Sequence, residues 1–256
     1  MNFKDHFSTG SPDYAAFRPT YPPALFAWLA SLCGQRELAW DCATGNGQAA
    51  RELTRHFKQV IATDASTQQI EAAEAFPGVE YRVAQAEASG LEAASVDLIT
   101  VAQAVHWFDL ERFYAEARRV LHSGGVIALW GYGRLVLPDA LDPALERFYS
   151  HTVGPYWPPE RTLVDDGYRS LAFPFDEVPA PSFAIQVSWN LPRLMAYLST
   201  WSAVKRYVAA LGSDPLVALE AELAALWGAQ DSVGIGQNSE ALRLEWPLFL
   251  RVGRHA

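Results

Sequence analysis

The chain changes character at Leu38-Ala39-Trp40-Asp41-Cys42-Ala43-Thr44-Gly45-Asn46-Gly47-Gln48, where a short apolar run gives way to a loop of small residues. The pattern predicts a strand, a tight loop and then a helix over about 48–57. Gly45 and Gly47 can adopt backbone angles closed to residues with a Cβ, and they let a ligand approach the main chain closely. The N–H groups that begin the helix would point toward that ligand. The loop therefore predicts a binding site for a small molecule.

The glycine loop is compatible with two nucleotide cofactors. It matches a dinucleotide fingerprint as Gly45-x-Gly47-x-x-Ala50, with Asp64 at the end of the second apolar run. Asp41 lies just ahead of the glycines, where a carboxylate would repel a pyrophosphate but attract the ammonium and sulfonium of S-adenosylmethionine. Asp64 would accept the ribose hydroxyls of either cofactor. Asp41 thus favours S-adenosylmethionine, and the nicotinamide dinucleotides stay open as an alternative.

The composition indicates one large domain with a sizeable core. The chain has 256 residues, of which 50% are hydrophobic, and a net charge of -9 without a dense Lys/Arg block, which disfavours nucleic acid and anionic membranes as partners. Residues 1–6 lack the apolar core of a signal peptide, and the longest apolar run, 24–30, is shorter than the ~20 residues that span a bilayer. We expect a soluble cytoplasmic protein. Cys33 and Cys42 lack the spacing of a disulfide framework or metal site, so we expect no bound metal.

Strands and helices alternate over residues 36–132. Strands are expected from Leu38 to Cys42 and over 60–64, 79–84, 96–101 and 126–130, with helices opening at Pro22-Pro23, Gln48, Ser66 and Asp109. Such alternation predicts a parallel sheet with helices on both faces, and ligands bind at the carboxyl ends of its strands. Five candidate residues each follow a strand end there: Gly45, Asp64, Gln85, Gln103 and Tyr132.

The rest of the chain predicts a lid and a final strand. Residues 133–235 are rich in proline and aromatics, with a strand expected over 183–189 and helices over 191–210 and 215–227. Residues 236–256 alternate in polarity from Leu242 to Val252, which favours an antiparallel strand. Together these patterns predict a single α/β domain. It consists of an N-terminal arm and helix (1–35), a cofactor-binding core (36–132), a lid and substrate region (133–235) and a C-terminal strand (236–256). The sheet would be Rossmann-like, seven-stranded and mostly parallel.

The aromatic N-terminal arm has two interpretations of equal weight. Tyr14 and Arg18 either pack on the core or fold over the cofactor mouth, where Arg18 would pair with a carboxylate in a two-pronged contact.

Together these residues resemble the class I S-adenosylmethionine-dependent methyltransferases, and within them the small-molecule branch that includes the trans-aconitate methyltransferases and related type 11 enzymes. The acids flanking the glycine loop carry the general resemblance. Three segments carry the closer one: Tyr14…Arg18-Pro19-x-Tyr21-Pro22, Ala102-Gln103-Ala104-Val105-His106-Trp107-Phe108-Asp109 and Leu198-Ser199-Thr200-Trp201-Ser202. The resemblance covers residues 10–132 and, more loosely, 183–253.

The resemblance implies roles for individual residues. Asp41 and the glycines would hold the methionine end of the cofactor, Asp64 the ribose, and Gln85 with Ala86 the adenine. Ala43 stands where the family usually has glycine and Gln85 where an acid is commoner, but the Gln85 carbonyl can still accept a hydrogen bond from the adenine amine. The residues expected to contact the cofactor are Tyr14, Arg18, Asp41, Ala43, Gly45, Gly47, Asp64, Ala65, Gln85, Ala86, Glu87 and Gln103.

The expected chemistry is methyl transfer to a small organic molecule, such as a carboxylic acid. A sulfonium is already a good leaving group, so the enzyme mainly has to hold the acceptor in line with the methyl group in a water-poor pocket. His106 follows the fourth strand and is either the general base for a hydroxyl or amine acceptor or a structural histidine; a carboxylate acceptor would need no base. Expected substrate contacts are Trp107, Tyr132, Tyr156 and Trp201, with Arg134, Trp157 and Arg161 as further candidates.

Two other functions remain compatible with the sequence. One is an NAD(P)-dependent oxidoreductase, which Asp41 and the antiparallel final strand disfavour. The other is a non-catalytic S-adenosylmethionine-binding protein, which the aromatic-rich lid disfavours.

Overall fold

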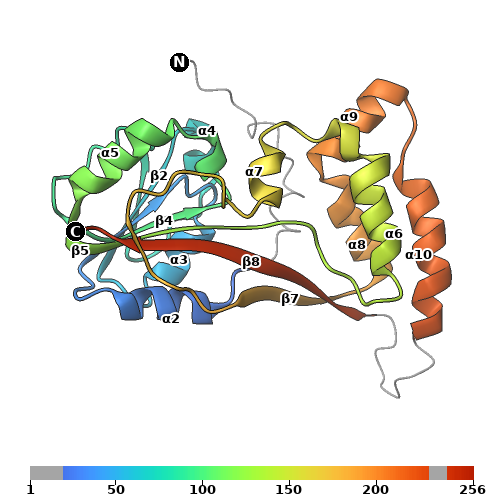
Figure 1. Ribbon diagram of the computed structural model, residues 1–256, viewed down its shortest axis with the longest axis horizontal. Coiled ribbons are helices and arrows are strands. Elements are labelled where there is room, and N and C mark those ends of the chain that lie inside the picture. Colours follow the sequence, from blue (N-terminus) through green and yellow to red (C-terminus); the bar gives the residue numbers. More distant parts are fainter. Residues whose placement is uncertain (1–19, 231–240) are drawn as a thin grey trace.

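The computed structural model describes residues 20–230 and 241–256, and its centre is a sheet in the order β3-β2-β1-β4-β5-β8-β6, with β7 also paired to β8 (Figure 1). β1 to β5 are parallel, whereas β8 runs antiparallel to β5, β6 and β7. This confirms the predicted mixed sheet with an antiparallel C-terminal strand, to which the two-residue β6 is added. The strands are β1 (Leu38–Cys42), β2 (Gln59–Asp64), β3 (Val79–Val83), β4 (Val96–Ala102), β5 (Leu121–Tyr132), β6 (Asp176–Glu177), β7 (Phe183–Trp189) and β8 (Leu242–Arg254).

The strand order reverses between β1 and β4. From β1 the chain proceeds outward to β2 and β3, and it then returns to the other side of β1 to form β4 and β5. At such a reversal the connections leave in opposite directions, so a crevice opens outside the carboxyl ends of the two strands. The glycine loop after β1 and the segment after β4 both lie at this edge.

Helices cover both faces of the parallel part of the sheet, as predicted (Figure 1). Alternate residues of β5 enter opposite clusters: Val126, Ala128 and Trp130 pack toward α2 and α3, whereas Ile127 and Leu129 pack toward α5. Because both faces are buried, these strands are apolar along their length. The bounds are α2 (Pro23–Leu32), α3 (Gln48–Leu53), α4 (Thr67–Ala72) and α5 (Leu110–Val120).

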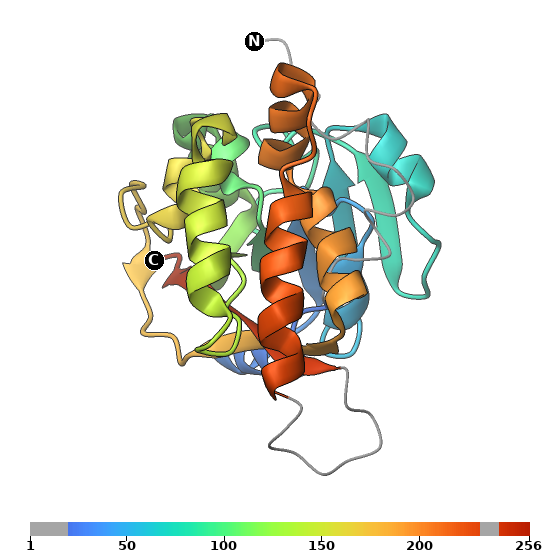
Figure 2. The ribbon, with the colours of Figure 1, turned by 90° about the vertical axis from the view of Figure 1, so that its right-hand side faces the viewer.

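A helical region stands beyond the carboxyl ends of the strands (Figure 1), and Figure 2 shows α6, α8 and α10 beside one another there. α10 packs on this region through Leu216, Leu219, Leu223 and Trp227, which are buried. No helix in the described part of the chain is long and apolar enough to cross a membrane. The bounds are α6 (Asp142–Arg147), a π-helical turn (Phe148–Thr152), a 3₁₀ turn (Gly154–Tyr156), α7 (Arg161–Asp165), α8 (Leu191–Ser199), α9 (Ser202–Leu211) and α10 (Leu216–Gln230).

Several boundaries differ from the sequence prediction. The single helix expected over 191–210 is wrong: the chain turns extended at Trp201, whose side chain is buried among the rings of Tyr149, Trp157 and Tyr197, and this separates α8 from α9. The helix after the first strand ends at Leu53, a few residues earlier than the expected end near residue 57. The strand expected over 126–130 begins earlier, at Leu121, and residues 122–125 belong to an irregular start of β5, where the register with β4 shifts.

An ion pair between the buried Asp97 and the partly exposed His122 joins β1, β4 and β5 at the amino ends of the strands, opposite the glycine loop. Asp97 of β4 is 2% exposed; its Oδ2 accepts the backbone N–H groups of Glu37 (2.7 Å) and Leu38 (2.9 Å), and its Oδ1 contacts Nε2 of His122. Nδ1 of His122 faces the carbonyl of Ser123 at 2.8 Å. Since both ring nitrogens face acceptors, the geometry suits the doubly protonated imidazolium. Partial burial lowers the pKa of His122, but these hydrogen bonds and the Asp97 charge outweigh it, so the net shift is upward.

This pair makes stability depend on pH. A histidine whose pKa is raised by folding contributes stability that is complete below the unfolded-state pKa of about 6.5 and is lost as pH rises through the folded-state value. We therefore expect the stability advantage of the wild type over His122→Gln to be largest in mildly acidic buffer and to shrink above neutrality. Urea unfolding of both proteins across this range measures the difference, and a gap that widened with pH would contradict the assignment.

Candidate active site

The glycine loop carries three residues in the left-handed region: Ala43 (φ 56°), Gly45 (φ 57°) and Gly47 (φ 83°). The Thr44 N–H donates to the carbonyl of Thr63 at 2.9 Å, which ties the loop to the end of β2. The loop is therefore a tight, fixed turn. Two of its three left-handed positions are glycines, as the sequence predicted, and the third is Ala43.

Asp41 lies beneath this loop. It is 1% exposed, and its two oxygens accept hydrogen bonds from the hydroxyls of Thr44 (2.5 Å) and Thr100 (2.7 Å). Burial raises the pKa of the Asp41 carboxyl to about 6, although both hydroxyls act in the opposite direction. The structure thus gives Asp41 the role of bracing the loop against β4, and its direct contact with a cofactor stays a prediction.

Asp64 ends β2 beside the loop. Its Oδ2 accepts the N–H of Gly45 and its Oδ1 the N–H of Ser66, both at 2.9 Å, so the carboxylate links the loop to the start of α4. Ala65 follows it and is partly exposed. Both residues lie at the carboxyl end of β2, where the sequence predicted them, and their contact with a cofactor stays a prediction.

The segment after β3 forms a small turn at the same edge. The Ala88 N–H donates to the carbonyl of Gln85 at 3.1 Å, which leaves Gln85 exposed and Ala86 buried. Glu87 Oε1 accepts the N–H of Asp109, the residue that caps α5, at 2.9 Å. The structure therefore brings these three expected adenine contacts to one side of the crevice. Tyr14 and Arg18 lie outside the described residues.

A cavity of about 170 Å³ lies between the strand ends and the helical region. Gln103, His106 and Tyr132 line it from the sheet side, and Trp157, Arg161, Tyr197 and Trp201 from the helical side. Trp107 also lines it, as predicted. Tyr156 does not; its ring packs against Tyr207 of α9 at 5.1 Å, on the outside of this wall. Sequence reasoning missed Tyr197, because its position within an apolar helix is equally typical of a core residue.

Gln103 joins the ends of β4 and β5 at the cavity. Its backbone is left-handed (φ 57°), its N–H donates to the carbonyl of Trp130 at 2.8 Å, and its side-chain amide donates to the carbonyl of Tyr132 at 2.9 Å. Backbone strain of this kind costs of order 1–3 kcal/mol and persists only where surrounding contacts enforce it. Gln103 therefore fixes the position of the two strand ends that support the cavity.

His106 lies in a 3₁₀ turn, Val105–Trp107, directly after β4. Its Nδ1 is 2.8 Å from the hydroxyl of Tyr168, a contact between residues 62 positions apart in the chain. Burial, and to a smaller extent the charge of Arg161, lowers the pKa of His106 to about 4, while Glu160 opposes the shift. The imidazole is therefore neutral at physiological pH.

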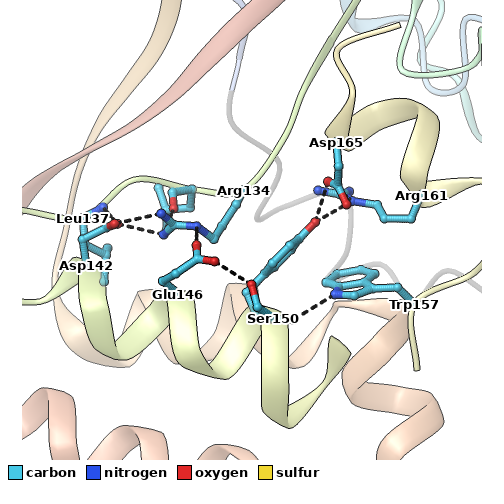
Figure 3. Close-up of polar contacts among 10 residues, drawn as sticks. Arg134, Leu137, Asp142, Glu146, Ser150, Trp157, Arg161 and Asp165 are labelled. Atoms are coloured by element: carbon cyan, nitrogen blue, oxygen red, sulfur yellow. Dashed lines mark hydrogen bonds and ion pairs between the residues drawn. The ribbon is translucent and has the colours of Figure 1, made fainter. Parts of the chain in front are cut away.

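Arg161 and Arg134 differ in what they leave available to a ligand (Figure 3). All three guanidinium nitrogens of Arg134 have partners. The two terminal nitrogens donate to the two oxygens of Asp142 at 2.8 Å, and Nε pairs with Glu146. Arg161 instead uses Nε for Tyr149 Oη (2.8 Å) and Asp165 Oδ1 (3.0 Å), and neither terminal nitrogen has a hydrogen-bond partner in residues 20–230 or 241–256. Only Arg161 lines the cavity.

Comparisons with known proteins identify the family. The family model described as a methyltransferase domain matches residues 40–129. A Dictyostelium discoideum protein whose name assigns it to the methyltransferases is 35% identical over 252 residues, which cover 97% of this chain and 94% of the relative. The chain belongs to the class I S-adenosylmethionine-dependent methyltransferases.

Further relatives agree with this assignment. A solved structure from Anaeromyxobacter dehalogenans, named for a type II methyltransferase, is 43% identical with a TM-score of 0.85 and covers 93% of this chain and 97% of its own. A Saccharomyces cerevisiae relative named for an S-adenosylmethionine-dependent methyltransferase is 30% identical over 55% of this chain and 51% of the relative. The methyltransferase uses S-adenosylmethionine, and the oxidoreductase and non-catalytic alternatives are set aside.

The loop of the methyltransferase has room for its cofactor. A Cβ built on Gly45 would meet only Gln69 Oε1, at 4.0 Å, so the surface above that residue is open, and Asp64 lies alongside it. A Cβ on Gly47 would lie 2.1 Å from Tyr81 Oη, so glycine is required there for packing. This open surface fits S-adenosylmethionine, and the contacts of Gly45 with its methionine end and of Asp64 with its ribose stay predictions.

We expect Ala43→Gly to stabilise the protein. Left-handed backbone costs a residue with a Cβ about 1–2 kcal/mol, and glycine's extra unfolded-state freedom offsets about 0.4–1 kcal/mol of the relief, which leaves a net gain of about 0.5–1 kcal/mol. Urea denaturation of the two proteins measures the change. A lower unfolding free energy for the variant would show that Ala43 makes packing contacts worth more than its strain.

We expect Asp64→Ala to weaken S-adenosylmethionine binding at least tenfold, about 1.4 kcal/mol, because the carboxylate that orders Gly45 and faces the ribose is removed. Calorimetric titration with S-adenosylmethionine and S-adenosylhomocysteine measures this. Glu111→Ala, an exposed acid on α5, is the matched control and should bind as the wild type does. Equal affinity in Asp64→Ala would contradict the ribose role.

Proposed function

We propose that the methyl acceptor is a small carboxylic acid, methylated on a carboxylate oxygen in the cavity beside His106. The observation that carries this proposal is Arg161, a cavity-lining cation whose two terminal nitrogens have no hydrogen-bond partner in the described part of the chain. A guanidinium presents its donors as a planar fork that matches the two oxygens of a carboxylate.

Arg161 is held ready for such a ligand. Its guanidinium carbon lies 4.9 Å from the centre of the Trp157 ring and 5.5 Å from that of Tyr149. Its Nε is fixed from the far side by Tyr149 and Asp165 (Figure 3). Because the side chain is ordered before any ligand arrives, less conformational entropy is lost on binding.

Tyr197 supplies a second donor to the same cavity. Its oxygen accepts the indole N–H of Trp246 at 3.2 Å, and no acceptor for its own proton is found in the described residues. Burial raises the pKa of the Tyr197 hydroxyl, so it keeps this proton. Tyr197 and Arg161 therefore favour an acceptor that offers anionic oxygens.

The chemistry needs little from the protein beyond orientation and dryness. When bound, S-adenosylmethionine supplies a methyl group on a sulfonium, which leaves as a neutral thioether once an oxygen has taken the methyl group. A carboxylate arrives deprotonated, so no residue has to accept a proton from it. The indole rings of Trp107, Trp157 and Trp201 form apolar walls that exclude water, and the donors of Arg161 and Tyr197 hold the acceptor.

A screen of small acids tests this function. Purified enzyme with isotope-labelled S-adenosylmethionine is offered mono-, di- and tricarboxylic acids, each beside the corresponding alcohol and amide. We expect methyl esters from acids alone. Methylation of alcohols or amines with no transfer to acids would overturn the proposal.

For the best acid, we expect Arg161→Met to raise KM about 10- to 100-fold, because a charged hydrogen-bonding group contributes about 1.5–3 kcal/mol. Arg161→Lys should fall between, since it keeps the charge and loses the fork. Arg169→Met is the matched control: Arg169 is exposed, pairs with Asp166 and lies away from the cavity lining. An unchanged KM in folded Arg161→Met would contradict the role of Arg161.

A further inference from the structure

We propose that Tyr168 fixes the tautomer of His106, so that His106 donates its Nε2–H to the acceptor instead of removing a proton from it. This inference rests on the proposed function and specifies how that same cavity selects its acceptor. It revises the role of general base that the sequence suggested for His106.

The argument begins with the proton of the Tyr168 hydroxyl. Tyr168 is fully buried, and among the described residues its hydroxyl has one hydrogen-bond partner, Nδ1 of His106 at 2.8 Å. If His106 carried its proton on Nδ1, the Tyr168 proton would be buried without an acceptor, at a cost of about 1–3 kcal/mol. If Tyr168 donates to a bare Nδ1, both groups are satisfied. In a neutral imidazole the remaining proton then lies on Nε2.

The position of Tyr168 is fixed by its backbone. Its φ of 60° is unusual for a bulky residue and follows Gly167, which is also left-handed. Its N–H donates to the carbonyl of Leu163 at 2.9 Å, and its carbonyl accepts from Arg251 at 3.2 Å. Its ring packs edge-on against Phe249 at 4.9 Å. Strain of this kind marks a conformation enforced by its surroundings, and here it holds the hydroxyl against His106.

The other nitrogen of His106 faces a different environment. His106 lines the cavity, and Nε2 has no hydrogen-bond partner within the described ranges. The charged groups that act on the ring are Arg161, which disfavours the imidazolium, and Glu160, which favours it; Trp107 and Tyr168 pack beside it. Burial and the Arg161 charge together outweigh Glu160 and keep the ring neutral, so a single N–H is available to the cavity.

Three donors therefore serve one small cavity: the terminal nitrogens of Arg161, the hydroxyl of Tyr197 and Nε2–H of His106. A carboxylate can accept from all three. A hydroxyl or amine acceptor would have to lose a proton, and an Nε2 that already carries one cannot take it. Tyr168 is thus a positioning residue for specificity, acting through His106, which would touch the acceptor.

Nitrogen NMR tests the tautomer without any acceptor. In the ¹⁵N-histidine-labelled enzyme with S-adenosylhomocysteine, the His106 signals, assigned by their loss in His106→Gln, should show an unprotonated Nδ1 and a protonated Nε2. Tyr168→Phe should move the Nδ1 signal by removing the donated hydrogen bond. Tyr114→Phe is the matched control, because Tyr114 is buried in the same cluster and its hydroxyl has no hydrogen-bond partner among the described residues. A proton on Nδ1 in the wild type would overturn the inference.

Kinetics test the donor role independently. The amide N–H of glutamine reaches about as far as Nε2–H and cannot act as a base, so His106→Gln should retain more of the wild-type kcat/KM for the best acid than His106→Ala does. His106→Ala should lose about tenfold or more, as expected for one hydrogen bond to a charged group. Equal losses in both folded variants, with a rate that rises on deprotonation of a group in the wild type alone, would indicate a base.

The two proposals can fail separately. If no carboxylic acid is methylated, the proposed function fails whatever tautomer the spectrum shows. If acids are methylated but Nδ1 carries the proton, the inference about Tyr168 fails and the proposed function stands.

Discussion

The site depends on one buried carboxylate at the point where the sheet reverses direction. Asp41 is the last residue but one of β1, and it accepts one hydrogen bond from a hydroxyl of the glycine loop and one from a hydroxyl of β4, the strand on the far side of the reversal. An unsatisfied buried carboxylate would be costly, so these bonds are enforced. They hold the loop in its left-handed turn and fix it relative to the segment that carries Gln103 and His106. The cofactor surface and the acceptor cavity are thereby built on a single frame.

Polar groups are paired within the protein at one end of the sheet, whereas the cavity lies at the other end. At the amino ends of the strands, Asp97 joins the start of β1 to β4 and to His122 at the start of β5, and every polar group of this cluster has a partner. At the carboxyl ends, the terminal nitrogens of Arg161, the hydroxyl proton of Tyr197 and Nε2 of His106 have no partner among residues 20–230 and 241–256. Buried polar groups normally find partners within the protein. Donors without one at the cavity therefore favour a ligand.

The helical region supplies one wall of the cavity at the carboxyl ends of the strands. The rings of Trp157, Trp201 and Tyr149 pack on one another at 5.0–5.7 Å and fix the wall that holds Arg161. Each ring comes from a short helix, a turn or the break between α8 and α9. Such irregular segments place side chains at angles that a continuous helix would not allow. Under the proposed function, acceptor choice depends on packing among aromatic residues far from the glycine loop.

The sequence by itself determined what local pattern controls. Apolar runs and turn residues predicted all seven longer strands, Gly45 and Gly47 predicted the tight loop, and Asp64 was correctly placed at a strand end, because these signals depend on neighbours within a few residues. The tertiary structure decided which arginine is available, since Arg134 and Arg161 look alike until Asp142 and Glu146 are seen to saturate the first. It also decided that Tyr156 lies outside the cavity and that Tyr168, 62 positions away, meets His106. The ion pairs of an arginine and the protonation of a histidine depend on contacts between distant segments. These contacts form only when the chain packs.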